Sequence, residues 1–142
     1  MTTPTPRDAI MRAEFFLDLA KKCPGDNRND FEAFMEASII FARAALHRLQ
    51  SKYNRHPKWK PWWDSLLSNS AVEFFRTERD FIMKEGPPKV GQIVRLGDPP
   101  AQMASELYYY EDPQTSATVT IEKHLEEMKL LIKYANNTFS NY

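Results

Sequence analysis

Apolar side chains recur along most of the chain with the spacing of an α-helix. Near the start they form one stripe, made of Ile10, Ala13, Phe16, Leu17 and Ala20. Thr5 is a good N-cap and Pro6 suits the first helical position, whereas Pro24-Gly25 is typical of a helix end. The pattern therefore predicts a first helix that opens at Thr5-Pro6 and ends before Pro24-Gly25.

The second apolar stripe is longer and predicts a helix that runs to about Tyr53. We expect Asn29 or Asp30 to cap it, because short polar side chains accept hydrogen bonds from the first free amides of a helix. The stripe consists of Phe31, Phe34, Met35, Ser38, Ala42, Ala45, Leu46 and Leu49. Such a helix spans roughly 35 Å, at 1.5 Å per residue, which is long enough for the central helix of a bundle.

The rest of the chain predicts two more long helices and a short one. The predicted elements are a connector at 54–61, a short helix at 62–67, a long helix at 71–84 capped by Asn69 or Ser70, and a last helix from Thr115 or Ser116 to about Asn136. This order predicts an all-α fold, an antiparallel four-helix bundle in which residues 1–142 form a single domain.

The segment between the last two long helices differs in composition. Residues 86–115 hold five of the ten prolines and three of the four glycines, with two β-prone runs at 92–96 and 107–110. They predict an irregular arm or a short β-hairpin before the last helix. Three consecutive tyrosines, 108–110, leave two interpretations open: contact with a partner or a second copy, or packing on the chain's own helices.

Charge is balanced overall and uneven along the chain. With 19 basic and 19 acidic residues the formal net charge is zero, which argues against a strongly electrostatic nucleic-acid binder. Residues 1–60 hold 11 Lys/Arg and 7 Asp/Glu, a net of +4, and residues 61–142 carry the compensating −4. The two halves could attract each other within the fold or across a dimer, although scattered surface charge also explains the difference.

Cysteine and histidine usage indicates neither a disulfide nor a metal site. Cys23 is the only cysteine, and the three histidines, His47, His56 and His124, lie at no metal-binding spacing. No apolar run is long enough for a membrane span, and the first residues lack a secretory-signal pattern. We therefore expect a cytoplasmic protein without a metal, a cofactor or a membrane anchor.

One stretch carries a resemblance to a known superfamily. Residues 63–87 include AVEFFRTERDFIMKEGP, in which Arg79-Asp80 is followed by Lys84 and then by Glu85-Gly86-Pro87. This resembles the motif region of the HEPN superfamily (higher eukaryotes and prokaryotes nucleotide-binding domains), in which an Arg and a polar residue precede a His. The resemblance implies a helical bundle that dimerises, with the motifs of two subunits sharing a cleft. It also implies a defence or toxin–antitoxin setting.

The chain departs from that motif at the residue that matters most for catalysis. Lys84 stands where ribonuclease members of the superfamily have their His, and an ordinary Lys, with a pKa of about 10.4, is a poor base at neutral pH. The departure favours a binding protein without catalytic residues over an enzyme. Arg76, Arg79, Asp80 and Lys84 remain a candidate phosphate or ligand site. The alternative is that Glu73, Arg76 and Asp80 form helix-surface pairs and Arg79 pairs with an acidic residue on a neighbouring helix.

A second basic cluster lies in the connector. It consists of Lys52, Arg55, Lys58, Trp59 and Lys60, and cations interleaved with aromatic rings are typical of single-stranded nucleic-acid binding. The alternative is that the tryptophans fold back and cover one end of the bundle, since a large aromatic ring is costly to expose.

Together these observations predict a non-catalytic, HEPN-like homodimer whose partner is RNA or another protein. A divergent, metal-independent ribonuclease using Arg79 and Lys84 is the first alternative. A plain protein-interaction module that docks through residues 86–115 is the second.

Overall fold

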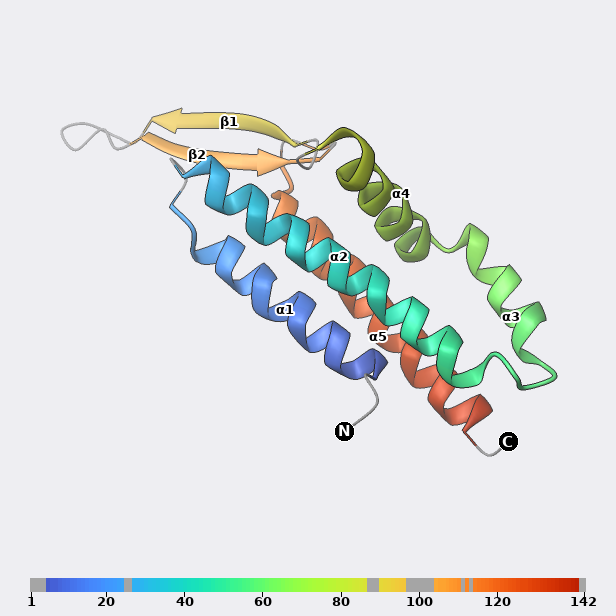
Figure 1. Ribbon diagram of the computed structural model, residues 1–142. Coiled ribbons are helices and arrows are strands. Elements are labelled where there is room, and N and C mark those ends of the chain that lie inside the picture. Colours follow the sequence, from blue (N-terminus) through green and yellow to red (C-terminus); the bar gives the residue numbers. More distant parts are fainter. Residues whose placement is uncertain are drawn as a thin grey trace.

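The computed structural model describes residues 5–24, 27–86, 90–96, 104–110, 112 and 114–140 and shows a mainly α-helical protein (Figure 1). Its helices are α1 (Pro6–Lys22), α2 (Arg28–Tyr53), α3 (Trp59–Ser65), the 3₁₀ turn η1 (Leu66–Ser68), α4 (Ser70–Glu85) and α5 (Ala117–Phe139). Its strands are β1 (Gly91–Leu96) and β2 (Ala104–Tyr109).

The four long helices lie side by side, and α2 contacts the other three (Figure 1). α5 packs behind α2 and also contacts α1 and α4. α2 and α5 run in one direction, while α1 and α4 run in the other. The outer face of α2 therefore lies between α1 on one side and α4 on the other, and it points away from the core.

Side-chain caps fix where the helices begin. The predicted caps Thr5, Asn69 and Ser116 each accept hydrogen bonds from backbone amides of the first helical turn. The predicted cap of the second helix was wrong by two or three residues, because Asn27 is the cap of α2. Asn27 accepts from the Asp30 amide at 3.2 Å and donates to the Asp30 carboxylate at 2.7 Å, which makes it the better cap.

Aromatic packing explains why two helix ends differ from their predicted positions. α3 begins at Trp59, inside the predicted connector, and α5 continues to Phe139 rather than Asn136. The Trp59 and Phe139 rings lie 5.3 Å apart, and both side chains are buried. Tyr53, at the end of α2, completes this cluster and donates a hydrogen bond to Asn136 at 2.5 Å.

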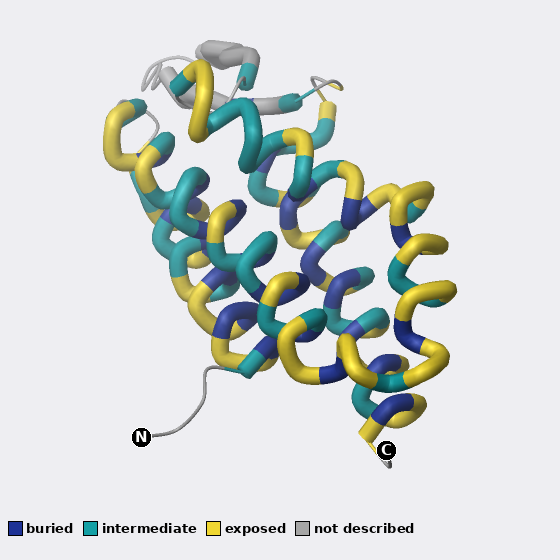
Figure 2. Tube along the Cα trace, turned by 45° about the vertical axis from the view of Figure 1, so that its right-hand side comes forward, coloured by how far each residue is buried: buried dark blue, intermediate teal, exposed yellow. Residues whose placement is uncertain are grey.

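The core lies where the stripes of the four long helices meet, and the buried positions of each helix point inward (Figure 2). Its largest fully buried side chains are Phe75, Met35, Ile39, Leu46, Leu49, Ile121, Leu125 and Met128. Among the described residues Ser38 is the only polar side chain of the core, and its hydroxyl donates to the Ala13 carbonyl at 2.8 Å. That bond ties α1 to α2.

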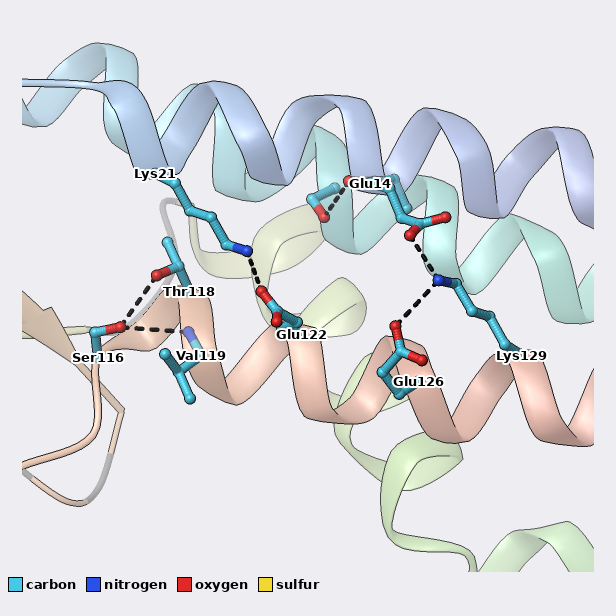
Figure 3. A network of polar contacts seen from close by, with 10 residues as sticks. Glu14, Lys21, Ser116, Thr118, Val119, Glu122, Glu126 and Lys129 are labelled. Atoms are coloured by element: carbon cyan, nitrogen blue, oxygen red, sulfur yellow. Dashed lines mark hydrogen bonds and ion pairs between the residues drawn. The ribbon is translucent and has the colours of Figure 1, made fainter.

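Ion pairs hold the rim between α1 and α5 (Figure 3). Lys129 lies between Glu14, at 2.7 Å, and Glu126, at 3.0 Å, and Lys21 pairs with Glu122. The hydrogen bonds that Lys129 donates to both glutamates raise its pKa. All these side chains are partly solvated, so each pair adds only up to about 1 kcal/mol.

The two strands pair antiparallel, with Gly91 opposite Tyr109 and Leu96 opposite Ala104. The hairpin lies across the end of the helices where α2 begins (Figure 1). Tyr108 stacks on Phe31 of α2 with ring centroids 4.3 Å apart, and the partly buried Tyr110 ring meets Phe74 of α4. These two tyrosines pack on the chain's own helices, while the side chain of Tyr109 lies outside the described residues.

Candidate functional site

The predicted site residues lie on one side of α4. Arg76, Asp80 and Lys84 follow one another at intervals of four residues, so they share a helix face, and Arg79 lies beside Asp80. The Arg79 guanidinium contacts the Asp80 carboxylate at 3.4 Å, and both side chains are nearly half exposed, at 42% and 48%. This face of α4 is turned toward α2.

α2 adds a third arginine to this face. Arg43 is partly buried, and burial lowers its pKa; Asp80 raises the same pKa, while Arg76 and Arg79 lower it. Arg76, Arg79 and Asp80 are therefore each close enough to Arg43 to act on its charge. We call Arg43, Arg76, Arg79 and Asp80 the arginine cluster. It places three positive charges around one negative charge.

His47 lies one turn beyond Arg43 on α2 and belongs to the same neighbourhood. Burial lowers the pKa of its imidazole, and the positive charges of Arg43 and Arg79 lower it further. Because the ordinary pKa of His is about 6.5, His47 is neutral at pH 7. A neutral imidazole beside arginines can accept a proton or a hydrogen bond.

Lys84 stands apart from the arginine cluster. It is exposed in the last turn of α4, and no contact between described residues joins it to the three arginines. A cation here stabilises the negative end of the helix dipole, which gives Lys84 a structural role. α4 ends one residue later, at Glu85, and is followed by Gly86 with φ 118°, a conformation that favours glycine.

The predicted surface pairs are largely absent from the described part of the chain. Neither Glu73 nor Arg76 forms an ion pair there, and Arg79 pairs with its neighbour Asp80 rather than with an acidic residue of another helix. The guanidinium group of Arg76 therefore has no carboxylate partner among the described residues.

The basic connector has a different character. Lys52, Arg55, Lys58 and Lys60 are all exposed. Trp59, however, is only 3% exposed, and its ring lies against Trp62, Trp63 and Phe139. That ring is not available to stack on a nucleic-acid base, so this patch offers exposed cations without Trp59 as an aromatic platform, as the alternative interpretation expects.

Three further titratable side chains lie outside the arginine cluster and contact neighbouring groups. The His124 ring stacks on Phe74 at 4.3 Å, and burial lowers its pKa. His56 accepts a hydrogen bond from the Lys58 amide, and the Cys23 thiol lies 3.5 Å from the Asn27 carbonyl oxygen. In the described ranges no group of three or more His, Cys, Asp or Glu side chains could hold a metal ion.

The sequence could not identify Arg43 and His47 as site residues. They precede Arg79 by 36 and 32 positions and belong to another helix, so only the packing of α2 on α4 brings them near the motif residues. Their spacing of four residues on one face of α2 was the only available signal.

Over the part of the chain that the structure describes, no helix is both long and apolar enough to cross a lipid bilayer. No protein-family model, curated protein or solved structure matches this chain, so its resemblance to the HEPN superfamily depends on the motif residues alone.

Proposed function

We propose that this chain is a non-catalytic, HEPN-like RNA-binding protein whose arginine cluster contacts the phosphates of single-stranded RNA. The observation that carries the proposal is that Arg43 of α2 lies within electrostatic range of Arg76, Arg79 and Asp80 of α4, where Arg79 pairs with Asp80. Such a cluster has more positive charge than its own acidic residue can neutralise. An RNA phosphate would supply the missing negative charge.

The geometry of arginine suits this role. A guanidinium group presents several N–H donors in one plane and can bind two phosphate oxygens at once. Arg79 keeps 42% of its side chain exposed while Asp80 holds it in place, so donors remain for a ligand. The chain's zero net charge implies modest affinity, and the small number of phosphate contacts implies a shallow dependence of that affinity on salt.

The arrangement of the helices supports the HEPN-like part of the proposal. Four long helices in alternating directions are compatible with a HEPN-like four-helix bundle, and the Arg79-Asp80 pair lies in the last turns of α4. Lys84 stands in place of the motif His and is exposed, so it lacks the burial that a lysine needs to act as a base at neutral pH. These features favour binding over catalysis, in the defence or toxin–antitoxin setting that the resemblance implies.

Fluorescence anisotropy with a labelled single-stranded RNA of mixed sequence tests the proposal. We expect the Arg76→Ala/Arg79→Ala double variant to bind more weakly. The slope of the logarithm of the binding constant against the logarithm of salt concentration should become shallower by about 1.4, because each of the two lost phosphate contacts removes about 0.7. Lys58→Ala/Lys60→Ala is the matched control, because it also removes two exposed cations. The proposal would be contradicted if the wild type does not bind the RNA, or if only the control variant loses affinity for it.

One observation favours a divergent ribonuclease as the second candidate. His47, neutral at pH 7 and beside Arg79, could take the proton of a ribose 2′-hydroxyl, a role that Lys84 fills poorly. Incubating the same RNA with the wild type, His47→Ala and Arg79→Ala distinguishes the two functions. Intact RNA in all samples supports a binding protein. Cleavage by the wild type that both variants lack would support the enzyme.

A further inference from the structure

The last third of α5 carries an exposed apolar ridge. Leu130 and Tyr134 lie four residues apart on one face of the helix and are 66% and 51% exposed. The Tyr134 ring stacks on Trp62 of α3, with ring centroids 5.6 Å apart, and Trp62 also lies against the buried Phe139. Tyr134 is therefore held in place although half of its surface faces solvent. We call Leu130 and Tyr134 the apolar ridge.

The protein is strongly basic around this ridge. Residues 51–63 and 130–140 hold five basic and no acidic residues, in a chain whose net charge is zero. The two segments lie together at one end of the bundle, where α3 packs beside the last turns of α5 (Figure 1). Lys60 pairs with Asp64. The other four cations are exposed and form no ion pair within the described residues: Lys52, Arg55, Lys58 and Lys133.

Two of these cations border the apolar ridge. Lys133 comes directly before Tyr134 on α5, and Lys58 lies one turn before Trp62 at the start of α3. Positive charges that lack acidic partners repel one another, and a partner that brings carboxylates to them removes that repulsion. An exposed apolar ridge with cations on both sides thus has the pattern of an interaction surface, with an apolar centre and a charged rim.

We propose that this end of the bundle binds an acidic amphipathic helix of another protein. Two side chains four residues apart form a ridge that fits between the side-chain rows of a second helix. The apolar face of the bound helix covers Leu130 and Tyr134, and its flanking Glu or Asp residues face Lys58 and Lys133. Tyr134, already fixed by Trp62, loses little side-chain entropy when the helix binds, which favours it as the centre of the contact.

The aromatic rings at this end favour a protein partner over nucleic acid or a membrane surface. Single-stranded nucleic acid stacks its bases on successive open rings, and membrane-surface proteins project Trp side chains into the lipid. Here Trp59 is buried, Trp62 and Trp63 are partly buried, and Tyr134 is the only exposed ring of the cluster within the described residues. The surface shares no residue with the arginine cluster, so its partner is additional to the RNA of the proposed function.

Fluorescence anisotropy with labelled synthetic peptides tests the inference on the full chain. The main probe is a helical peptide of about 18 residues, or five turns, with Leu at every third or fourth position and Glu elsewhere. A second peptide has Lys in place of each Glu, and a third has the composition of the first in an order that spreads its leucines around the helix. We expect the acidic amphipathic peptide to bind at least about tenfold more tightly than either of the others.

Variants of the two parts of the surface should weaken that binding. Leu130→Ser removes half of the apolar ridge and should raise the dissociation constant about fivefold or more. Lys58→Glu/Lys133→Glu should raise it about tenfold or more and should abolish the preference for the acidic peptide over the basic one. The matched controls are Val119→Ser, which removes a 43% exposed apolar side chain from the other end of α5, and Lys22→Glu/Lys123→Glu, which reverses two exposed cations elsewhere. Both should bind the peptide like the wild type.

Far-UV circular dichroism confirms that each variant is folded. The inference would be overturned if the wild type did not prefer the acidic amphipathic peptide, or if a folded Leu130→Ser variant bound it unchanged. It would also be overturned if the controls lost as much affinity as the surface variants. Single-stranded RNA, and vesicles of equal parts phosphatidylcholine and phosphatidylglycerol, complete the test. If the peptide does not bind while Leu130→Ser loses affinity for RNA or vesicles, the surface serves a nucleic acid or a membrane, and the proposed partner is wrong.

Discussion

Asp80→Asn should have opposite effects on stability and on RNA affinity. The substitution keeps the shape of the side chain and removes the only negative charge of the arginine cluster. Asp80 contacts Arg79 at 3.4 Å with both side chains nearly half exposed, so solvent screens the pair and its loss should cost at most about 1 kcal/mol. For a domain of this size that corresponds to a Tm lowered by about 2–4 °C.

The same change should strengthen RNA binding. In this variant a phosphate that enters the cluster is not repelled by the Asp80 carboxylate and does not compete with it for Arg79. One more cationic contact therefore becomes available to the phosphate. The slope of log K against log salt should therefore steepen by about 0.7. Thermal unfolding and fluorescence anisotropy give the two readouts. Asp18→Asn, on the exposed face of α1, is the matched control. If Asp80→Asn weakens RNA binding while the protein stays folded, the carboxylate contributes to binding, and our account of the cluster is wrong.

Two predictions concern stability. Burial lowers the pKa of His47 and His124, so the folded protein binds their protons less readily than the unfolded chain does. The free energy of unfolding should therefore fall as pH drops below about 6.5, and denaturant titrations at pH 8 and pH 5 should show a smaller fall in His47→Gln/His124→Gln than in the wild type. An equal fall would contradict the pKa directions. Ser38→Ala removes a buried hydroxyl that donates to Ala13 at 2.8 Å and should cost about 0.5–1.5 kcal/mol. The same change at the exposed Ser51 should cost almost nothing.

The helices could be predicted wherever local sequence determines them. Thr5-Pro6 and Asn69 define the starts of α1 and α4 through short-range hydrogen bonds, and the structure confirms both. α3 starts earlier than predicted because Trp59 is buried against Phe139, which lies 80 positions away in the sequence. Periodicity within a short window contains no information about that contact.

The site residues divide in the same way, into those that local sequence indicates and those that only the packing of helices brings together. The motif on α4 is defined by its own spacing, so Arg76, Arg79 and Asp80 could be proposed as site residues from the sequence. Arg43 and His47 could not be found, because they join the motif only through the packing of α2 on α4. The basic connector has a related limit: its cations and aromatic rings left both nucleic-acid binding and coverage of the bundle end open, and the burial of Trp59, which favours the second, is not visible in the sequence.

The most direct test of the arginine cluster is nuclear magnetic resonance of the arginine Nε–H groups during titration with single-stranded RNA. Resonances assigned by Arg76→Lys and Arg79→Lys should shift with RNA concentration, while that of Arg55, in the basic connector, should stay in place. Shifts confined to Arg55, or no shift of any arginine at saturating RNA, would contradict the claim that this cluster binds phosphate.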